Sequence, residues 1–497
     1  MWKTLEKSIA SQLPGISGTV LCAEDSIRKT GDLTICAAHD DVQRFLVLAA
    51  AGKSPVFDSF EGEIAVSDDL IVKKAPLTHR NADSLRALFP WTKPVPVLRR
   101  KCSFGCGDRL GCASSAHAEL FKKYDAAPVL AQQSVRELTL TGRTFQSVVD
   151  DATFQVFQSG YEGGFGADGD HLKSFEHIGE ALKAGVTMLT LDLSEQLKPE
   201  FAEADEATVS AAYAALPADL RERIEQNYTT VPQLGLNFTA LERMRCALIY
   251  TQAMDFSAQV RTFLNENGGA DTDLEISIDE TTAPTIPEHH YFVAAELVYR
   301  NVNFVSLAPR FIGEFQKGID YIGDLAEFER QFAVHAKIAD DFGFYKLSIH
   351  SGSDKFSAFP IIGRLTGGRV HVKTAGTSWL EAARMIASQD PALFRDMLKC
   401  AKKHLADARK LYHVTADFDS IPEPDSIPDS ELIRLLDADC VPGRQIIHIN
   451  YGAMLGGACP ELTARIRAAL IRHEDAYAAC LDKHFVHHLE TLGIPLK

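Results

Sequence analysis

The chain has 497 residues, 46% of them hydrophobic, which is enough for a large buried core and too long for one minimal domain. Its formal net charge is −16 and it has no basic run, so we expect no nucleic-acid partner. No apolar stretch reaches the roughly 18 residues of a membrane span, and residues 1–15 lack the apolar run of a signal peptide. We therefore expect a cytoplasmic protein without membrane contact, whose ten cysteines are reduced thiols.

Residues 1–95 mix short apolar runs with turns, which predicts a small N-terminal α/β domain. The proline-rich stretch Pro90–Leu98 has the composition of a linker. Over residues 96–497, strand-like and helix-like segments alternate, which predicts an α/β fold with a parallel sheet. Residues from about 195 to 267 are helical in pattern and too long for one barrel helix, so we expect a helical insertion there.

Four segments of the second region alternate apolar and polar residues, so each has one polar face as a β-strand. These polar faces consist of Thr190, Asp192 and Ser194; Glu275, Ser277 and Asp279; Lys346, Ser348 and His350; and Arg369, His371 and Lys373. An open doubly wound sheet would gather its ligand groups at one switch point. Polar groups at the ends of several strands instead favour a (β/α)8 TIM-like barrel with a site at its C-terminal face.

His350 and His371 each end a strand on its polar face and are followed by small residues. Neutral imidazole is the commonest protein ligand for zinc and similar divalent ions, so both are candidate metal ligands. The alternative is that each imidazole caps its strand by a hydrogen bond to the backbone.

Asp170 and His171 close a loop rich in glycine and acidic residues, from which both side chains can enter a cavity. Asp170 can equally be the N-cap of a helix that starts near Leu172. On the next polar strand, Glu275 and Asp279 are candidate acid–base groups at different depths. A structural ion pair between Glu275 and Lys346 or Arg369 in the barrel floor is equally compatible with the sequence.

Cationic side chains in the same loops suit a substrate that carries a carboxylate or a phosphate. We expect four of them to bind substrate, although each by itself is also compatible with a surface charge: Arg109, Arg310, Lys355 and Lys373. The helix that carries His484, His487 and His488 has no acidic third ligand in its sequence, so we expect it to be solvated.

Several long strings resemble the tagaturonate epimerase (hexuronate epimerase) family. They cover residues 107–111, 132–144, 164–173, 275–281, 306–324, 346–356 and 367–382. The resemblance implies a barrel isomerase that depends on a divalent metal (Zn, Mn, Ni or Co) and interconverts two keto-uronates, D-tagaturonate and D-fructuronate. It also implies that His171 and His350 hold the metal and that Asp170 is one acid–base group. The residues after Gly111 differ from the family pattern, so the resemblance assigns no role to His117.

The resemblance leaves the second acid–base group open among Glu275, Asp279 and Glu280, and the role of His371 rests on its position in the strand alone. The two keto-uronates differ at a carbon β to the ketone, where direct deprotonation has a high barrier, so a retro-aldol route is favoured. A metal-dependent aldolase or ketose isomerase acting on a sugar acid is the alternative enzyme, and a sugar-acid-binding protein the alternative without catalysis. No oligomeric state follows from the sequence.

Overall fold

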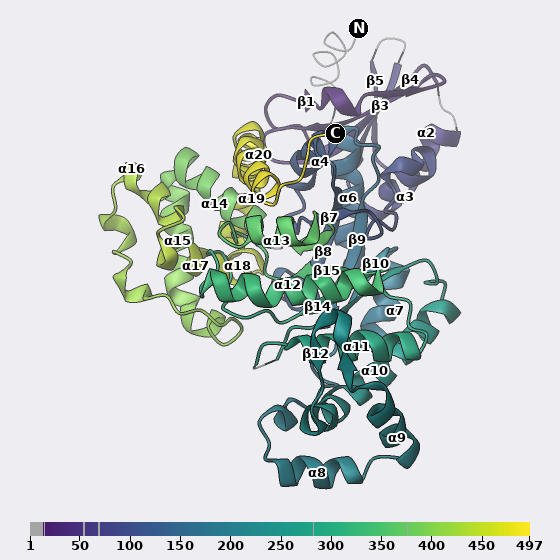
Figure 1. Cartoon of the computed structure of the whole chain (residues 1–497). Helices are drawn as coiled ribbons and strands as arrows, with labels where there is room; N and C mark the ends of the chain where they lie inside the picture. Colours follow the sequence, from purple (N-terminus) through teal and green to yellow (C-terminus); the bar gives the residue numbers. More distant parts are fainter. Residues whose placement is uncertain (1–12, 14, 53–54, 68–69, 282, 375) are drawn as a thin grey trace.

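The computed structural model describes residues 13 and 15–497, except 53–54, 68–69, 282 and 375. Two larger sheets dominate it: an antiparallel sheet near the N-terminus and a closed parallel barrel (Figure 1). Across the described residues, no helix combines the length and the apolar character that crossing a bilayer requires.

The barrel is formed by eight parallel strands, each paired with the next around a closed ring. In chain order they are β7 (Cys102–Gly105), β8 (Ala127–Ser134), β9 (Gly166–Leu172), β10 (Met188–Asp192), β13 (Asp273–Ile278), β14 (Ser306–Pro309), β15 (Lys346–Ile349) and β16 (Val370–Lys373). The four segments predicted from their alternating pattern are β10, β13, β15 and β16. The predicted (β/α)8 barrel is confirmed, and apolar residues of its strands form one hydrophobic core with those of the surrounding helices.

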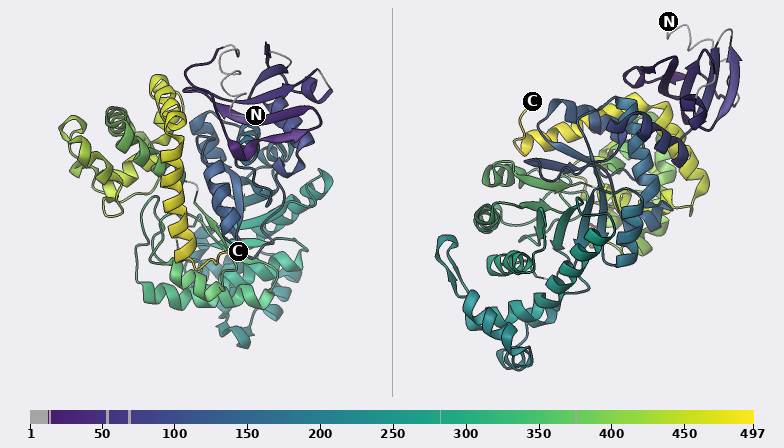
Figure 2. Two further views of the ribbon diagram at one scale, coloured as in Figure 1. Left: turned by 90° about the horizontal axis from the view of Figure 1, so that it is seen from above. Right: turned by 90° about the vertical axis from the view of Figure 1, so that its right-hand side faces the viewer.

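Helices connect the strands and surround the barrel (Figure 2). Apart from the helices of the segment between β10 and β13, those between its strands are α4 (Ser114–Lys123), α5 (Val135–Thr141), α6 (Phe145–Ser159), α7 (Phe175–Lys183), α11 (Pro287–Tyr299), α12 (Leu325–Phe342) and α13 (Phe359–Thr366). Local sequence explains their ends. For example, the Asp324 side chain accepts hydrogen bonds from the backbone N–H groups of Ala326 and Glu327 to start α12, which ends at Gly343 with φ +77°.

The segment between β10 and β13 extends away from the barrel at the bottom of Figure 1. It contains α8 (Glu206–Ala214), α9 (Ala218–Asn227), the short pair β11 (Thr230–Val231) and β12 (Leu236–Asn237), and the 27-residue α10 (Ala240–Glu266). Thr239 and Glu242 form a capping box that starts α10. The segment expected to be almost wholly helical thus includes a two-stranded ribbon.

The N-terminal sheet is antiparallel, with the order β1-β3-β4-β6-β5 and β2 paired to β3. Its elements are β1 (Leu21–Cys22), β2 (Arg28–Thr30), β3 (Leu33–His39), β4 (Arg44–Ala50), α2 (Pro55–Ser59), β5 (Glu63–Ser67), β6 (Leu70–Pro76) and α3 (His79–Leu88). One face of this sheet forms a hydrophobic cluster with Phe154 and Phe157 of α6. The sheet therefore packs directly on a barrel helix.

After the last barrel strand the chain forms a helical layer on one side of the barrel (Figure 1). It consists of α14 (Thr377–Gln389), α15 (Pro391–Ala408), α16 (Asp429–Leu432), α17 (Val441–Ile449), α18 (Tyr451–Leu455), α19 (Pro460–Arg472) and α20 (Glu474–Thr491). The expectation that the α20 histidines are solvated is wrong for two of them. His488 is fully buried and His484 nearly so, because α20 packs against α14 and α4, and the acidic Asp354 from the loop after β15 contacts both.

Candidate active site

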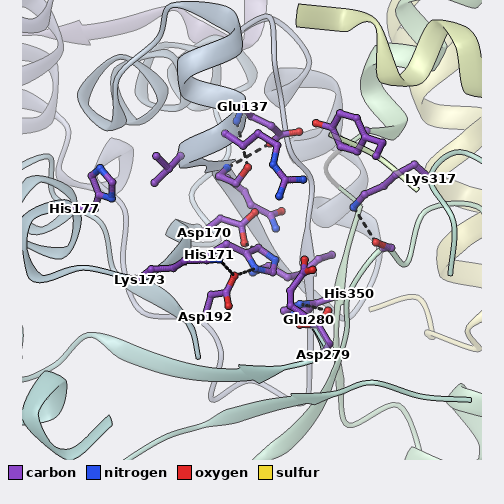
Figure 3. A pocket seen from close by; sticks show the side chains of 18 of the residues that line it. Glu137, Asp170, His171, Lys173, His177, Asp192, Asp279, Glu280, Lys317 and His350 are labelled. Carbon is purple, nitrogen blue, oxygen red and sulfur yellow. Dashed lines mark hydrogen bonds and ion pairs between the residues drawn. The ribbon is translucent and has the colours of Figure 1, made fainter. Parts of the chain in front are cut away.

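A cavity of about 520 Å³ opens at the C-terminal ends of the barrel strands (Figure 3). Its lining is rich in charged and polar groups from several strands and their following loops. It includes Arg109, Gln132, Arg136, Glu137, Asp170, His171, Lys173, Asp192, Asp279, Glu280, Lys317, His350, Ser351, Lys373 and Tyr412. The C-terminal face is where barrel enzymes hold their catalytic groups.

Asp170 and His171 lie on strand β9 and not in the loop that the glycine-rich sequence predicts. The glycines have a packing reason: a Cβ on Gly169 would lie 2.8 Å from Leu189 Cδ2, and one on Gly166 would lie 2.8 Å from a Val97 methyl. The strand therefore follows an alternation in which Asp168 and Asp170 share a face. Its end is bent, since His171 has φ +55°. The next helix, α7, is capped by Ser174, so Asp170 is not its N-cap.

His171 and His350 face each other in the cavity, with their ring centroids 4.9 Å apart. His171 Nδ1 lies 3.4 Å from Asp192 Oδ2. His350 lies between two carboxylates, with Nδ1 3.1 Å from Asp279 Oδ2 and Nε2 2.8 Å from Glu275 Oε1. Imidazoles from two distant stretches of the chain are thus brought into contact.

Lys373 of β16 is surrounded by carboxylates. Its Nζ lies 2.6 Å from Asp170 Oδ1, 2.9 Å from Asp168 Oδ2 and 3.3 Å from Glu275 Oε1. All four side chains are buried. One ammonium is thus shared among three acidic groups, of which Glu275 also contacts His350.

The pKa values follow from this arrangement. Burial would raise the pKa of Asp170, but the charge of Lys373 outweighs burial and lowers it. The pKa of Asp168 shifts in the opposite direction. Burial, together with the nearby charges of Asp170 and Glu275, raises it to about 7 in spite of Lys373. Burial would lower the pKa of His350, yet Asp279 and its hydrogen bonds raise it to about 10.

A divalent cation fits this set of donors. Two imidazoles together with the Asp170 and Asp279 carboxylates provide mixed nitrogen and oxygen ligands, which suit Zn, Mn, Ni or Co. Beneath the imidazoles, the buried Glu275 Oε2 has no hydrogen-bond partner among the described residues, although its other oxygen is paired with His350 and Lys373.

Two tighter groups of metal-ligand type lie elsewhere in the described part of the chain. Their ligand atoms are within 4.8 Å of one another: Asp354, His484 and His488; and Cys400, His404 and Cys459. Neither group lines the cavity, and the imidazole pair with its carboxylates is less compact than either. In the first group the Arg444 guanidinium already supplies a positive charge, since its Nη2 lies 2.9 Å from Asp354 Oδ1.

Some residues expected at the site lie apart from the imidazole pair. His371 is buried below the cavity, its Nδ1 2.9 Å from Ser103 Oγ. The Lys355 ammonium is enclosed by backbone carbonyl groups, including those of Gln316 and Ile319. Arg310 lines an adjoining cavity, which shares His350, Ser351 and Lys317 with the main one.

Arg109 does line the main cavity, but it is committed to Glu137, to which its Nε donates at 2.7 Å, and its guanidinium stacks on Tyr451. The buried His117, which the sequence leaves without a role, lies 3.2 Å from Ser378 Oγ.

Three further charged residues in or near the cavity have no role predicted from the sequence. If residues 166–172 are interpreted as a strand, Asp168 is predicted to lie on the same face as Asp170. Asp192 ends the polar face of β10, which the alternating pattern had revealed without assigning it a role. Lys317 lies in the loop after β14, where no periodicity indicates that its side chain enters the cavity.

Comparisons with known proteins agree with one another. The model of the tagaturonate epimerase family (UxaE) matches residues 23–492. The tagaturonate/fructuronate epimerase of Thermotoga maritima is 39% identical over 473 residues, which cover 94% of this chain and 96% of that protein. Crystal structures of the fructuronate-tagaturonate epimerase UxaE from Cohnella laeviribosi also match. The native form has a TM-score of 0.91 at 42% identity over 99% of this chain and 100% of that one. The form with one glycerol has a TM-score of 0.92 at 41% identity over 99% of each chain. The chain therefore belongs to the tagaturonate epimerase family of isomerases.

Proposed function

We propose that this chain interconverts D-tagaturonate and D-fructuronate in hexuronate catabolism, and that it uses a divalent cation to do so. The observation that carries the proposal is the meeting of His171 and His350 with several carboxylates at the C-terminal end of a closed barrel. Membership of the family supports the choice of substrate.

The cation would be held by His171 and His350, with the cavity carboxylates of Asp170, Asp192 and Asp279 each within 3.7 Å of an imidazole nitrogen. When bound, it supplies Lewis-acid polarisation of the substrate's carbonyl and hydroxyl oxygens. His371 is proposed as a supporting group beneath the site because Ser103 holds one of its ring nitrogens.

The chain's own residues would move the protons of a retro-aldol route. One carboxylate removes the proton from the hydroxyl group on the carbon to be inverted, and the adjacent C–C bond breaks to give an aldehyde and an enediolate. The aldehyde turns over, the bond re-forms, and an acid returns a proton to its oxygen. We assign Asp170 to one of these roles, with Lys373 holding it ionised.

For the second acid–base group, Asp279 and Glu280 line the cavity, whereas Glu275 lies beneath it with one oxygen held by His350 and Lys373. In Figure 3, Asp279 lies on the other side of the imidazole pair from Asp170. We therefore favour Asp279 or Glu280 for the second role, because inversion needs proton transfer on two sides of the substrate.

The decisive test supplies each keto-uronate separately and follows formation of the other. Activity should disappear after chelation and return when Zn, Mn, Ni or Co is added back. Full activity after complete metal removal would contradict the role of the cation. Three-carbon cleavage products in place of the epimer would identify an aldolase, and an aldose product would identify a ketose isomerase.

A second test separates the two chemical routes. Epimerisation in D2O by the retro-aldol route leaves the hydrogen of the inverted carbon in place, so NMR should detect no deuterium there. Incorporation of deuterium at that carbon during turnover would establish direct deprotonation instead.

A further inference from the structure

The cationic side chains of the cavity differ in whether protein carboxylates already neutralise them. Five lysine and arginine side chains line it: Arg109, Arg136, Lys173, Lys317 and Lys373. Lys373, Arg109 and Lys173 all have carboxylate oxygens within ion-pair distance. Arg136 is exposed and donates to a backbone carbonyl at the surface. Lys317 remains as a cation inside the cavity whose charge no carboxylate of the described residues balances at that distance.

The backbone around Lys317 is held firmly. Lys355 donates from Nζ to the carbonyl oxygens of Gln316 at 2.9 Å and Ile319 at 2.6 Å, one residue before and two residues after Lys317. The carbonyl of Lys317 itself lies 3.4 Å from Gln445 Nε2. The side chain therefore enters the cavity from a rigid loop, which lowers the entropic cost of binding a ligand.

One hydrogen bond fixes the position of the Lys317 ammonium group. Lys317 Nζ donates to Ser351 Oγ at 2.8 Å, and Figure 3 shows Lys317 reaching in from the side opposite to Lys173. Ser351 follows His350 directly and has φ +51°, a left-handed conformation that is costly for a serine. Backbone strain of this kind persists where the surrounding structure enforces a functional geometry.

The environment of the ammonium favours an anion. Burial lowers the pKa of Lys317, and the more distant charges of Glu137 and Glu280 only partly oppose this effect. A partly desolvated cation that lacks a close counter-charge gains most from a ligand that brings one.

We propose that Lys317, supported by Ser351, binds the carboxylate of the substrate and makes the cavity select sugar acids over neutral ketohexoses. This inference rests on the proposed epimerase function for the identity of the sugar acid. Ser351 Oγ accepts from Lys317, so its own hydrogen is free to donate to a carboxylate oxygen. An anion at this point lies next to His350, which leaves the rest of the sugar to extend towards His171 and Asp170.

The assignment differs from the cations expected from sequence. The Lys355 ammonium is enclosed by carbonyl groups and serves to hold the Lys317 loop. Arg310 lines only the adjoining cavity, whereas Lys317 and Ser351 line both, and Arg109 is already paired with Glu137.

The test uses Lys317→Met, which keeps the length of the side chain and removes its charge, alongside Lys317→Arg, which keeps the charge. For the keto-uronates we expect Lys317→Met to lower kcat/KM roughly 30- to 100-fold, mostly through KM, because a hydrogen bond to a charged group is lost. Lys317→Arg should recover part of this loss, and Ser351→Ala should cost only a few-fold. Lys337→Met, the same change at an exposed position of α12, should have no effect.

Binding measurements make the test independent of catalysis. By calorimetry, Lys317→Met should weaken D-galactonate roughly 30-fold or more and leave the uncharged galactitol unchanged. Equal weakening of both ligands would mean that Lys317 only shapes the cavity, and unchanged binding of both would also overturn the inference. Epimerisation by Lys317→Met at unchanged KM would defeat the inference while the proposed function stands. If galactonate binding depends on the charge of Lys317 but the protein does not epimerise the keto-uronates, the inference stands and the proposed function fails.

Discussion

The charge balance of the barrel interior depends on Lys373, whose ammonium lies within 3.3 Å of three buried carboxylates. Asp170 lines the cavity and keeps a lowered pKa, whereas Asp168 lies below it and has a raised one. The two aspartates are two residues apart on one strand, so they form a matched pair for substitution.

We expect Asp170→Asn to lower kcat by about 10²–10⁴-fold, since a positioned acid–base group contributes that much. Asp168→Asn should stay within about tenfold of the parent, because an amide resembles the protonated acid that the raised pKa favours. Steady-state kinetics on both keto-uronates would measure the difference. Equal losses in the two variants would remove Asp170 from its assigned role.

Lys346, at the bottom of the barrel, gives stability a dependence on pH. Its Nζ donates to Ser103 Oγ at 2.7 Å and to the Arg100 carbonyl at 2.9 Å, but burial lowers its pKa from 10.5 to about 8. Between these two values the unfolded chain binds a proton that the folded chain has released, so the free energy of unfolding rises with pH.

Relative to Lys346→Met, the parent should therefore gain up to about 3 kcal/mol of stability between pH 7.5 and 10.5. Urea unfolding of both proteins across that range would measure the gain. Parallel curves would mean that Lys346 keeps an ordinary pKa in the folded protein.

The loop after β15 carries His350 and Ser351 to the cavity, and its far end is tied to α20. His488 Nε2 accepts a hydrogen bond from the backbone N–H of Asp354 at 3.0 Å, and its Nδ1–H donates to the His484 carbonyl at 2.9 Å. Burial lowers the pKa of His488 to about 4, so the ring is neutral and both of its nitrogens are satisfied. Asp354 has φ +61°, a strained left-handed conformation, and its hydrogen bond to His488 helps to hold the backbone there.

His488→Ala should destabilise the protein by about 1–3 kcal/mol, because it leaves a buried N–H without an acceptor. It should also lower kcat/KM about tenfold through displacement of the loop. The neighbouring His487 is exposed, and His487→Ala should change stability by less than about 0.5 kcal/mol. Thermal unfolding and kinetics of this pair would decide whether α20 positions the site loop.

The whole molecule joins an antiparallel sheet to a barrel through α6. Phe157 is fully buried there, with its ring centroid 5.4 Å from that of Phe89 and 6.0 Å from that of Trp91. It packs in one cluster with Leu46 and Leu48 of β4. The interface is thus a hydrophobic core, and we expect sheet and barrel to unfold together.

Phe157→Ala should lower the free energy of unfolding by about 3–5 kcal/mol while a single transition remains. Phe175→Ala, at a position 37% exposed on α7, is the control and should cost much less. Two separate transitions in the parent protein, detected by circular dichroism and tryptophan fluorescence, would show that the N-terminal sheet unfolds independently.

Sequence periodicity was a reliable guide wherever a strand had one polar and one apolar face. The segments that became β10, β13, β15 and β16 were identified in this way. The pattern failed at β9, where Gly166 and Gly169 occupy positions that neighbouring side chains fill. It failed also for His488, which is buried against Phe104, Phe356 and Phe359, far away in the chain.

By itself, the sequence determined the barrel, the family resemblance and the strand end that carries His350, because side-chain alternation is a local property of the backbone; it placed Asp170 and His171 in a loop, whereas they lie on β9. The tertiary structure alone decided which charges meet. It showed Lys373 among three carboxylates, Arg109 committed to Glu137, and Lys317 without a carboxylate partner in the described chain. Pairing between charges depends on distances between separate segments of the chain, as for Asp170 and Lys373, which are 203 residues apart, and local sequence patterns do not encode those distances.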